Sequence, residues 1–150
     1  MSDKSRSDEQ CKAEKYLVDE LEKKLGYPLK RNYDLSVPDT DGANICPDFY
    51  SKEHLVIGEV FDHIGKPKKA RDNKIANDIL KMLLYDEKTG IKHRKILVVC
   101  DEAEARKLKG KSALAASIQT FGIEVVRIDL CDVLREKVLA AQSRQRMVNV

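Results

Sequence analysis

The stretch Ile45-Cys46-Pro47-Asp48-Phe49-Tyr50, followed after a short polar segment by Leu55-Val56-Ile57-Gly58-Glu59-Val60-Phe61, predicts two neighbouring apolar strands. Each predicted strand carries one acid, Asp48 in the first and Glu59 in the second. A charge inside a strand is costly unless a cation or another partner compensates it. Paired carboxylates are also the ligands that a hard divalent cation such as Mg2+ needs. Asp48 and Glu59 are therefore candidate metal ligands.

The register of the predicted hairpin decides whether the two acids share a face of the sheet. A connection of even length, residues 52–53 or 51–54, puts both acids on one face. Asp48 then lies opposite Ile57, and Glu59 is its diagonal neighbour, about 7–8 Å away at the backbone. That separation allows both carboxylates to bind one metal ion. A connection of odd length would place the acids on opposite faces and remove the site.

The rest of the sequence predicts further helices and strands in the order αβββαβαβα. Predicted helices cover residues 10–25, 67–86, 103–121 and 132–147, and predicted strands cover residues 29–37, 43–50, 55–61, 95–100 and 123–130. The strands that carry the acids are apolar on both faces, which is typical of central strands covered by helices on each side. The pattern predicts an α/β fold with a disordered tail over residues 1–9 and a single domain over residues 10–150.

The composition favours a soluble globular protein, with 42% apolar and 35% charged residues in a chain of 150. No apolar run approaches the roughly 20 residues of a membrane span, so no membrane partner is expected. The scattered cysteines form no CxxC pair, which predicts reduced thiols in a cytoplasmic protein without a zinc site. They are Cys11, Cys46, Cys100 and Cys131.

Glu14 is a third candidate acid, because it falls near the middle of the apolar stripe of the first predicted helix. That stripe consists of Leu17, Val18, Leu21 and Leu25. An acid on a buried helix face needs a partner, and a metal-centred cluster of Asp48, Glu59 and Glu14 supplies one. The alternative is a solvated acid in the first turn that favours the helix N-terminus.

A basic segment follows Gly65 and is predicted to neutralise phosphates of a nucleic acid, because it adjoins the acids. Its members are Lys66, Lys68, Lys69, Arg71 and Lys74. On a helical wheel, Lys68 lies on the side of the apolar stripe, whereas Lys74 and Lys81 point to the other side. The stripe used for this projection is Ile75, Ala76, Ile79, Leu80 and Leu83. The alternative is a solvated charged surface.

These motifs resemble the restriction-endonuclease-like, or PD-(D/E)XK, nuclease superfamily. The similar stretches are Glu14-x-x-Leu17-x-x-x-Leu21-x-x-x-Leu25-Gly26-Tyr27, Pro47-Asp48 and Glu59-Val60-Phe61. The element order is also similar to the common core of the superfamily over residues 10–130. The resemblance implies a central mixed sheet flanked by helices and magnesium-dependent cleavage of phosphodiester bonds.

The sequence departs from the superfamily pattern at Phe61, which occupies the position of the motif lysine. A lysine there would orient the attacking water or stabilise the charge that develops on phosphate. Some members of the superfamily take this lysine from a neighbouring element. Lys68 is the first candidate for that role, followed by Lys66 and Lys74. If none of them reaches the site, the domain binds nucleic acid without cutting it.

The resemblance implies that Asp48 and Glu59 hold one or two Mg2+ ions, helped by the Val60 carbonyl and by Glu14, and that Mn2+ can substitute. The leading hypothesis is a magnesium-dependent endodeoxyribonuclease. The second is an inactive relative that serves as a nucleic-acid-binding or protein-assembly module, and the third is an α/β domain whose acids are structural. A second copy of the chain or a partner subunit is expected to supply specificity.

Overall fold

A mixed sheet in the order β1-β4-β5-β6-β7 organises the computed structural model, which describes residues 8–65 and 68–148. The elements are α1 (Asp8–Leu25), β1 (Lys30–Arg31), β2 (Leu35–Ser36), β3 (Asn44–Ile45), β4 (Phe49–Ser51), β5 (Val56–Phe61), α2 (Lys69–Thr89), β6 (Arg94–Val99), α3 (Glu102–Leu108), α4 (Ala113–Thr120), β7 (Glu124–Arg127) and α5 (Asp132–Val148). The predicted α/β class, with a central mixed sheet flanked by helices, is confirmed.

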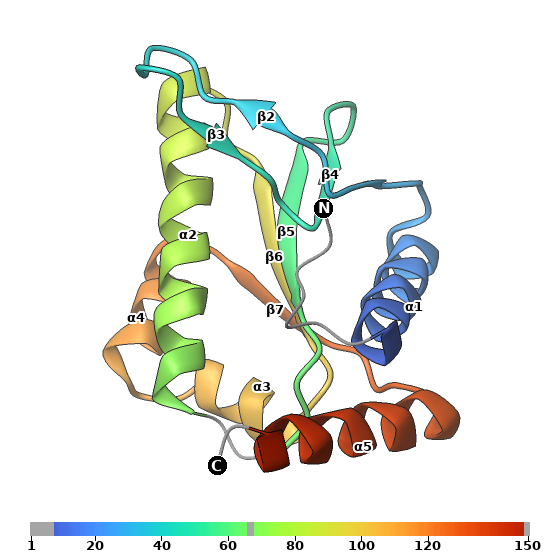
Figure 1. The fold of residues 1–150 in the computed structure, drawn as a ribbon. Helices are drawn as coiled ribbons and strands as arrows, with labels where there is room; N and C mark the ends of the chain where they lie inside the picture. Colours follow the sequence, from blue (N-terminus) through green and yellow to red (C-terminus); the bar gives the residue numbers. More distant parts are fainter. Residues whose placement is uncertain (1–7, 66–67, 149–150) are drawn as a thin grey trace.

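Strands β5 and β6 are the centre of the sheet. β4 pairs with β5 antiparallel, whereas β5 with β6 and β6 with β7 are parallel pairs. A parallel pair needs a crossover connection, and α2 supplies it between β5 and β6. Helices cover both faces, so the central strands are buried on both sides (Figure 1). This burial explains why residues 55–61 alternate little between apolar and polar side chains.

Two hydrophobic cores lie on the two faces of the sheet. On one face, α2, α3, α4 and the β2–β3 hairpin pack against Tyr50, Ile57 and Phe61. On the other face, α1 and α5 pack against Phe49 and Val60, among other residues. Figure 1 shows α2 and α4 on one side of the strands and α1 on the other. Successive residues of β5 therefore contact different helices.

The predicted strands over residues 29–37 and 43–50 each divide into two short strands. Asn32 adopts a φ of 49°, and the chain turns there from β1 in the main sheet to β2 in a separate two-stranded sheet. Asparagine enters this left-handed region more readily than most residues. Pro47 separates β3 from β4 because it has no backbone N–H to donate. The sequence pattern alone did not predict either bend.

The predicted helices are present, but their ends differ from the prediction and one of them is broken. The helix predicted over residues 103–121 is broken near Gly110 into α3 and α4, and Ser112 caps α4 by accepting a hydrogen bond from the Ala115 N–H. α1 begins at Asp8, so the last part of the predicted disordered tail is helical. Residues 1–7 of that tail lie outside the described residues. No helix in the described ranges is long and apolar enough to cross a membrane.

Gly58 allows the centre of the sheet to pack closely next to Glu59. A Cβ atom at this position would overlap the Ile96 carbonyl oxygen of β6 and the ring of Phe49 from β4. The ring could rotate, but the carbonyl belongs to the β5–β6 ladder and cannot move without breaking it. Glycine is therefore required here for steric reasons.

We expect Gly58→Ala to lower the free energy of unfolding by about 1–3 kcal/mol, as overpacked cores do. Urea denaturation followed by circular dichroism measures this loss. Gly110→Ala is the matched control, because its Cβ would meet the Lys107 carbonyl oxygen at 3.2 Å, a tight contact that a shift of a few tenths of an ångström relieves. Equal losses in the two variants would contradict the steric argument.

Candidate functional site

Asp48 and Glu59 lie opposite each other at the point where β4 begins. Phe49 pairs with Gly58, and the next step of this register places Asp48 opposite Glu59. The connection, residues 52–55, has an even length, so of the two alternatives the structure has the one that places both acids on one face. The predicted diagonal pairing was wrong by one step, because Ser51 still pairs with Val56 and the loop closes one residue later.

The backbone of β5 holds Asp48 in place. The Val60 N–H donates a hydrogen bond of 2.8 Å to Asp48 Oδ2. Pro47 is buried immediately before Asp48, and its ring restricts the backbone there. One carboxylate oxygen of Asp48 is thus already bound by the neighbouring strand, and the carboxyl group is fixed in orientation.

The two acids disfavour each other's charge. Burial raises the pKa of Glu59 far above its usual range, and the negative charge of Asp48 raises it further. Two carboxylates that share a site cannot both ionise easily without a cation. The pair therefore retains a proton at neutral pH when no cation is present, and a divalent cation would displace it.

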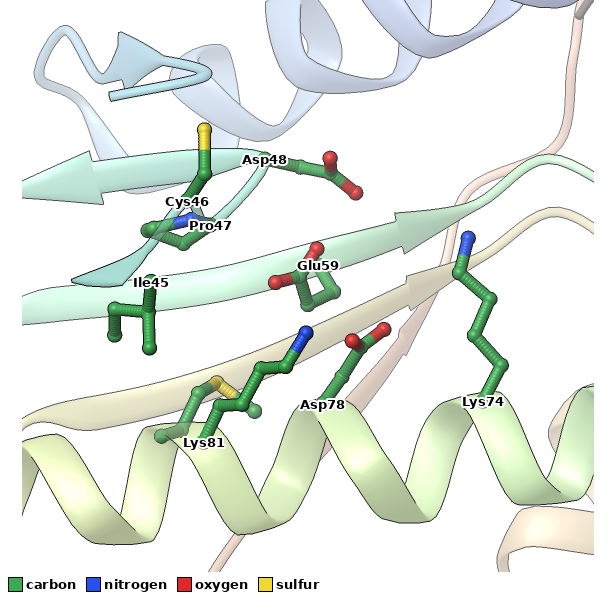
Figure 2. Close-up of a pocket in the computed structure, with 9 residues that line it drawn as sticks. Ile45, Cys46, Pro47, Asp48, Glu59, Lys74, Asp78 and Lys81 are labelled. Atoms are coloured by element: carbon green, nitrogen blue, oxygen red, sulfur yellow. The ribbon is translucent and has the colours of Figure 1, made fainter. Parts of the chain in front are cut away.

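The acids open into a pocket of about 190 Å³ between β5 and α2. Lys74, Asp78 and Lys81 of α2 extend their side chains from the helix toward the sheet, and Lys81 points toward Glu59 (Figure 2). The rest of the lining consists of Ile45, Cys46, Pro47 and Met82. The pocket therefore combines carboxylates from two strands with ammonium groups from one helix.

The predicted orientation of α2 was wrong. Its buried residues are Ile75, Asp78, Ile79, Met82 and Tyr85, whereas Leu80 is 64% exposed. The helix is rotated relative to the wheel projection, because Met82 and Tyr85 pack with the residues of the β2–β3 hairpin in one core. This rotation brings Lys74 and Lys81 to the pocket and not to the opposite side.

The predicted basic segment does not gather at the acids as a group. Lys68 and Lys69 are exposed at the start of α2, and neither lines the pocket. Arg71 lies toward α3, where its NH1 atom is 3.6 Å from Glu104 Oε2. Lys66 lies outside the described residues. Among the described members of the segment, Lys74 lines the pocket, so it replaces Lys68 as the first candidate for the missing lysine.

Phe61, which stands where the resembled motif has a lysine, contacts Lys74. The Nζ atom of Lys74 lies 5.8 Å from the centroid of the Phe61 ring, within the range of a cation–π contact. Phe61 is itself only 6% exposed and belongs to the core on the α2 face. The ammonium group of Lys74, from helix α2, therefore packs over the Phe61 ring at the edge of the pocket.

Glu14 is buried, as its place on the apolar stripe predicted, but it does not line the pocket among the described residues. Its helix α1 packs against the face of the sheet that includes Val60, whereas Glu59 opens toward α2. The structure therefore brings Asp48 and Glu59 together without Glu14.

The two carboxylates of Asp48 and Glu59 suit a cation such as Mg2+, which keeps several water ligands, better than a cation that is bound by protein atoms alone. In the described part of the chain, no three His, Cys, Asp or Glu side chains form a group that could hold a metal ion. Mg2+ commonly binds through one or two carboxylates and completes its shell with water and substrate phosphate. The pair of Asp48 and Glu59 fits that requirement. The Val60 carbonyl remains a predicted further ligand.

Sequence reasoning did not identify Asp78 as a residue of the site. The signal was present, because Lys74, Asp78 and Lys81 follow one another at spacings of four and three and so share one helix face. An aspartate in that row, beside the apolar Ile75, Ile79 and Met82, indicated a polar patch against the sheet.

Comparisons with models of protein families, with curated proteins and with solved structures found no match for this chain. The function therefore has to be inferred from the residues of the pocket.

We expect Glu59→Gln to stabilise the protein in metal-free buffer, and more strongly at pH 8 than at pH 5. The raised pKa of Glu59 means that the folded state keeps a proton that the unfolded state loses above about pH 4.5, so stability falls as pH rises. The glutamine amide of the variant does not titrate, so this loss disappears. We expect the free energy of unfolding to rise by about 1–3 kcal/mol at pH 8. Urea denaturation at both pH values in EDTA measures it.

The control is Glu53→Gln, whose side chain is 87% exposed in the β4–β5 loop. It should leave the pH dependence of the wild type unchanged. The same pH dependence in Glu59→Gln and the wild type would show that Glu59 is not the buried titrating group.

Proposed function

We propose that this chain is a metal-dependent nuclease of the restriction-endonuclease-like type that hydrolyses phosphodiester bonds in DNA. The observation that carries the proposal is the pocket in which Asp48 and Glu59 face Lys74 and Lys81 of α2. Carboxylates attract a divalent cation, and ammonium groups attract the phosphate that the cation must reach. The order of antiparallel β4–β5, crossover helix α2 and parallel β6 supports the same proposal, because it agrees with the core that the motifs resemble.

The cation would be held by Asp48 and Glu59. A bound Mg2+ would supply activation of a water molecule and polarisation of the scissile phosphate. Asp48 is kept in orientation by the Val60 N–H, so binding requires little rearrangement of this carboxylate. Glu59 gives up its proton when it becomes a ligand, which makes binding of the cation stronger as pH rises.

The lysines of α2 act on the phosphate side of the pocket. Lys74, held beside Phe61, is placed to orient the attacking water or to stabilise the negative charge that develops on phosphate. Lys81 provides a second ammonium group on the same wall. Lys68 and Lys69, exposed at the start of α2, are placed to contact the sugar–phosphate backbone outside the pocket.

A catalytically inactive module that binds nucleic acid or assembles with protein is the second candidate. It is favoured by Phe61 at the position of the motif lysine. It is also favoured by a pocket to which the strands contribute only two acids, Asp48 and Glu59. The two candidates share the same binding surface and differ in whether Lys74 performs the role of the motif lysine.

We expect cleavage of plasmid and single-stranded DNA in Mg2+ or Mn2+ and none in EDTA. Asp48→Asn and Glu59→Gln should each lower the rate by about 100-fold or more, since each removes a ligand of the cation. Lys74→Met should lower the rate by about 10- to 100-fold, because it removes the charge and keeps the contact with Phe61. Lys68→Met, a matched change outside the pocket, should alter the rate by less than about threefold.

Bound DNA without metal-dependent cleavage would favour the inactive module. If DNA is neither bound nor cleaved, and a Mn2+-soaked crystal shows no density between Asp48 and Glu59, these acids have a structural role. Equal losses in Lys68→Met and Lys74→Met would contradict the assignment of Lys74.

A further inference from the structure

A groove between α2 and α4 gathers half of the exposed large apolar side chains in the described part of the chain. The groove has a volume of about 990 Å³ and lies on the side of the sheet that α2 and α4 cover (Figure 1). Eight such side chains are exposed among the described residues, and four of them line this groove: Leu80, Leu84, Ile91 and Phe121. Apolar side chains that gather in one exposed patch mark an interaction surface, whereas scattered ones are ordinary.

The groove is separate from the pocket of the acids. The two share no lining residue among those described. At 3.6 residues per turn, Leu80 and Leu84 lie roughly 120–160° around α2 from Asp78, which lines the acid pocket. A partner bound in the groove would therefore leave the acid pocket open. For this reason, an inference about the groove does not depend on the proposed function.

The shape of the groove combines a protruding ring with open space. Phe121 is 48% exposed at the end of α4, and Gly122 follows it directly. Gly90, at the end of α2, and Gly122 have φ values of 69° and 66°, and a Cβ atom at either position would meet no atom within 4 Å. An interface between two identical surfaces needs both halves of each contact on one surface. A ring beside a hollow meets that requirement.

The charges of the groove are also complementary to themselves. Glu87 and Lys92 line it, both are exposed, and neither is in an ion pair with another described residue. Asp86 and Lys95, which also line it, already pair with each other. A two-fold axis through the groove brings Glu87 of each copy to Lys92 of the other, so both charges gain an opposite partner. A uniformly charged partner such as a nucleic acid would meet one of the two with the same sign.

We infer that this groove is the interface of a symmetric homodimer, in which Leu80 and Phe121 of two copies pack together and Glu87 pairs with Lys92 across the axis. Thirteen described residues line the groove, against roughly 20–30 on each side of a standard interface. The dimer is accordingly weak, and we expect a dissociation constant of about 1–100 µM. Both acid pockets stay accessible in such a dimer.

The first test is sedimentation velocity of the full chain over a concentration range of about 1–500 µM, which spans the expected dissociation constant. Leu80→Lys should raise the dissociation constant at least about tenfold, because it places two charges in the apolar part of the interface. Val133→Lys is the matched control, since Val133 is 61% exposed on α5 and does not line the groove, whereas Leu80 is 64% exposed. It should leave the constant unchanged. Circular dichroism checks that both variants are folded.

A charge-reversal experiment tests the predicted pairing across the axis. Glu87→Lys alone places two lysines opposite each other, and Lys92→Glu alone places two glutamates opposite each other. Each variant should dimerise at least about tenfold more weakly than wild type. An equimolar mixture of the two variants has opposite charges at both contacts, so it should form a heterodimer within about threefold of the wild-type affinity.

Three outcomes would overturn the inference. A wild type that stays monomeric over the whole concentration range would leave the groove to another kind of partner. A dimer that Leu80→Lys does not weaken, or that Val133→Lys weakens equally, would use another surface of the chain. A mixture of Glu87→Lys and Lys92→Glu that dimerises no better than either variant alone would exclude the two-fold pairing.

Discussion

The placement of two carboxyl groups opposite each other on neighbouring segments of the sheet is the constraint on which the rest of this structure depends. Asp48 and Glu59 lie opposite each other at the start of β4, and burial together with mutual repulsion keeps a proton on the pair. Such an arrangement is unfavourable for stability, because each carboxylate loses water without gaining an opposite charge. A divalent cation bound as we propose would offset this cost.

The neighbouring groups reduce this cost without removing it. The Val60 N–H satisfies one oxygen of Asp48, and the ammonium groups of Lys74 and Lys81 line the same pocket. Asp78 adds a third carboxyl group to this pocket, on α2 between Lys74 and Lys81.

Some features of the fold follow from local rules that can be applied to the sequence. Side chains point to alternate faces along a strand, so any even connection between the two strands places both acids on one face. The break at Gly110 depends on the same kind of local chemistry, since glycine disfavours a helix interior and Ser112 caps the next helix. Features of this kind involve residues close together in sequence.

The sequence by itself determined the α/β class and the apolar central strands, and it showed that an even connection would place Asp48 and Glu59 on one face. Only the tertiary structure decided which side chains meet these acids. The rotation of α2 depends on the packing of Met82 and Tyr85 with a hairpin that is distant in sequence, and it brings Lys74 to the pocket. A helical wheel treats all apolar residues as equal, whereas a close-packed core buries only the side chains whose shape fits it. The partners of the acids therefore could not be predicted from the sequence pattern alone.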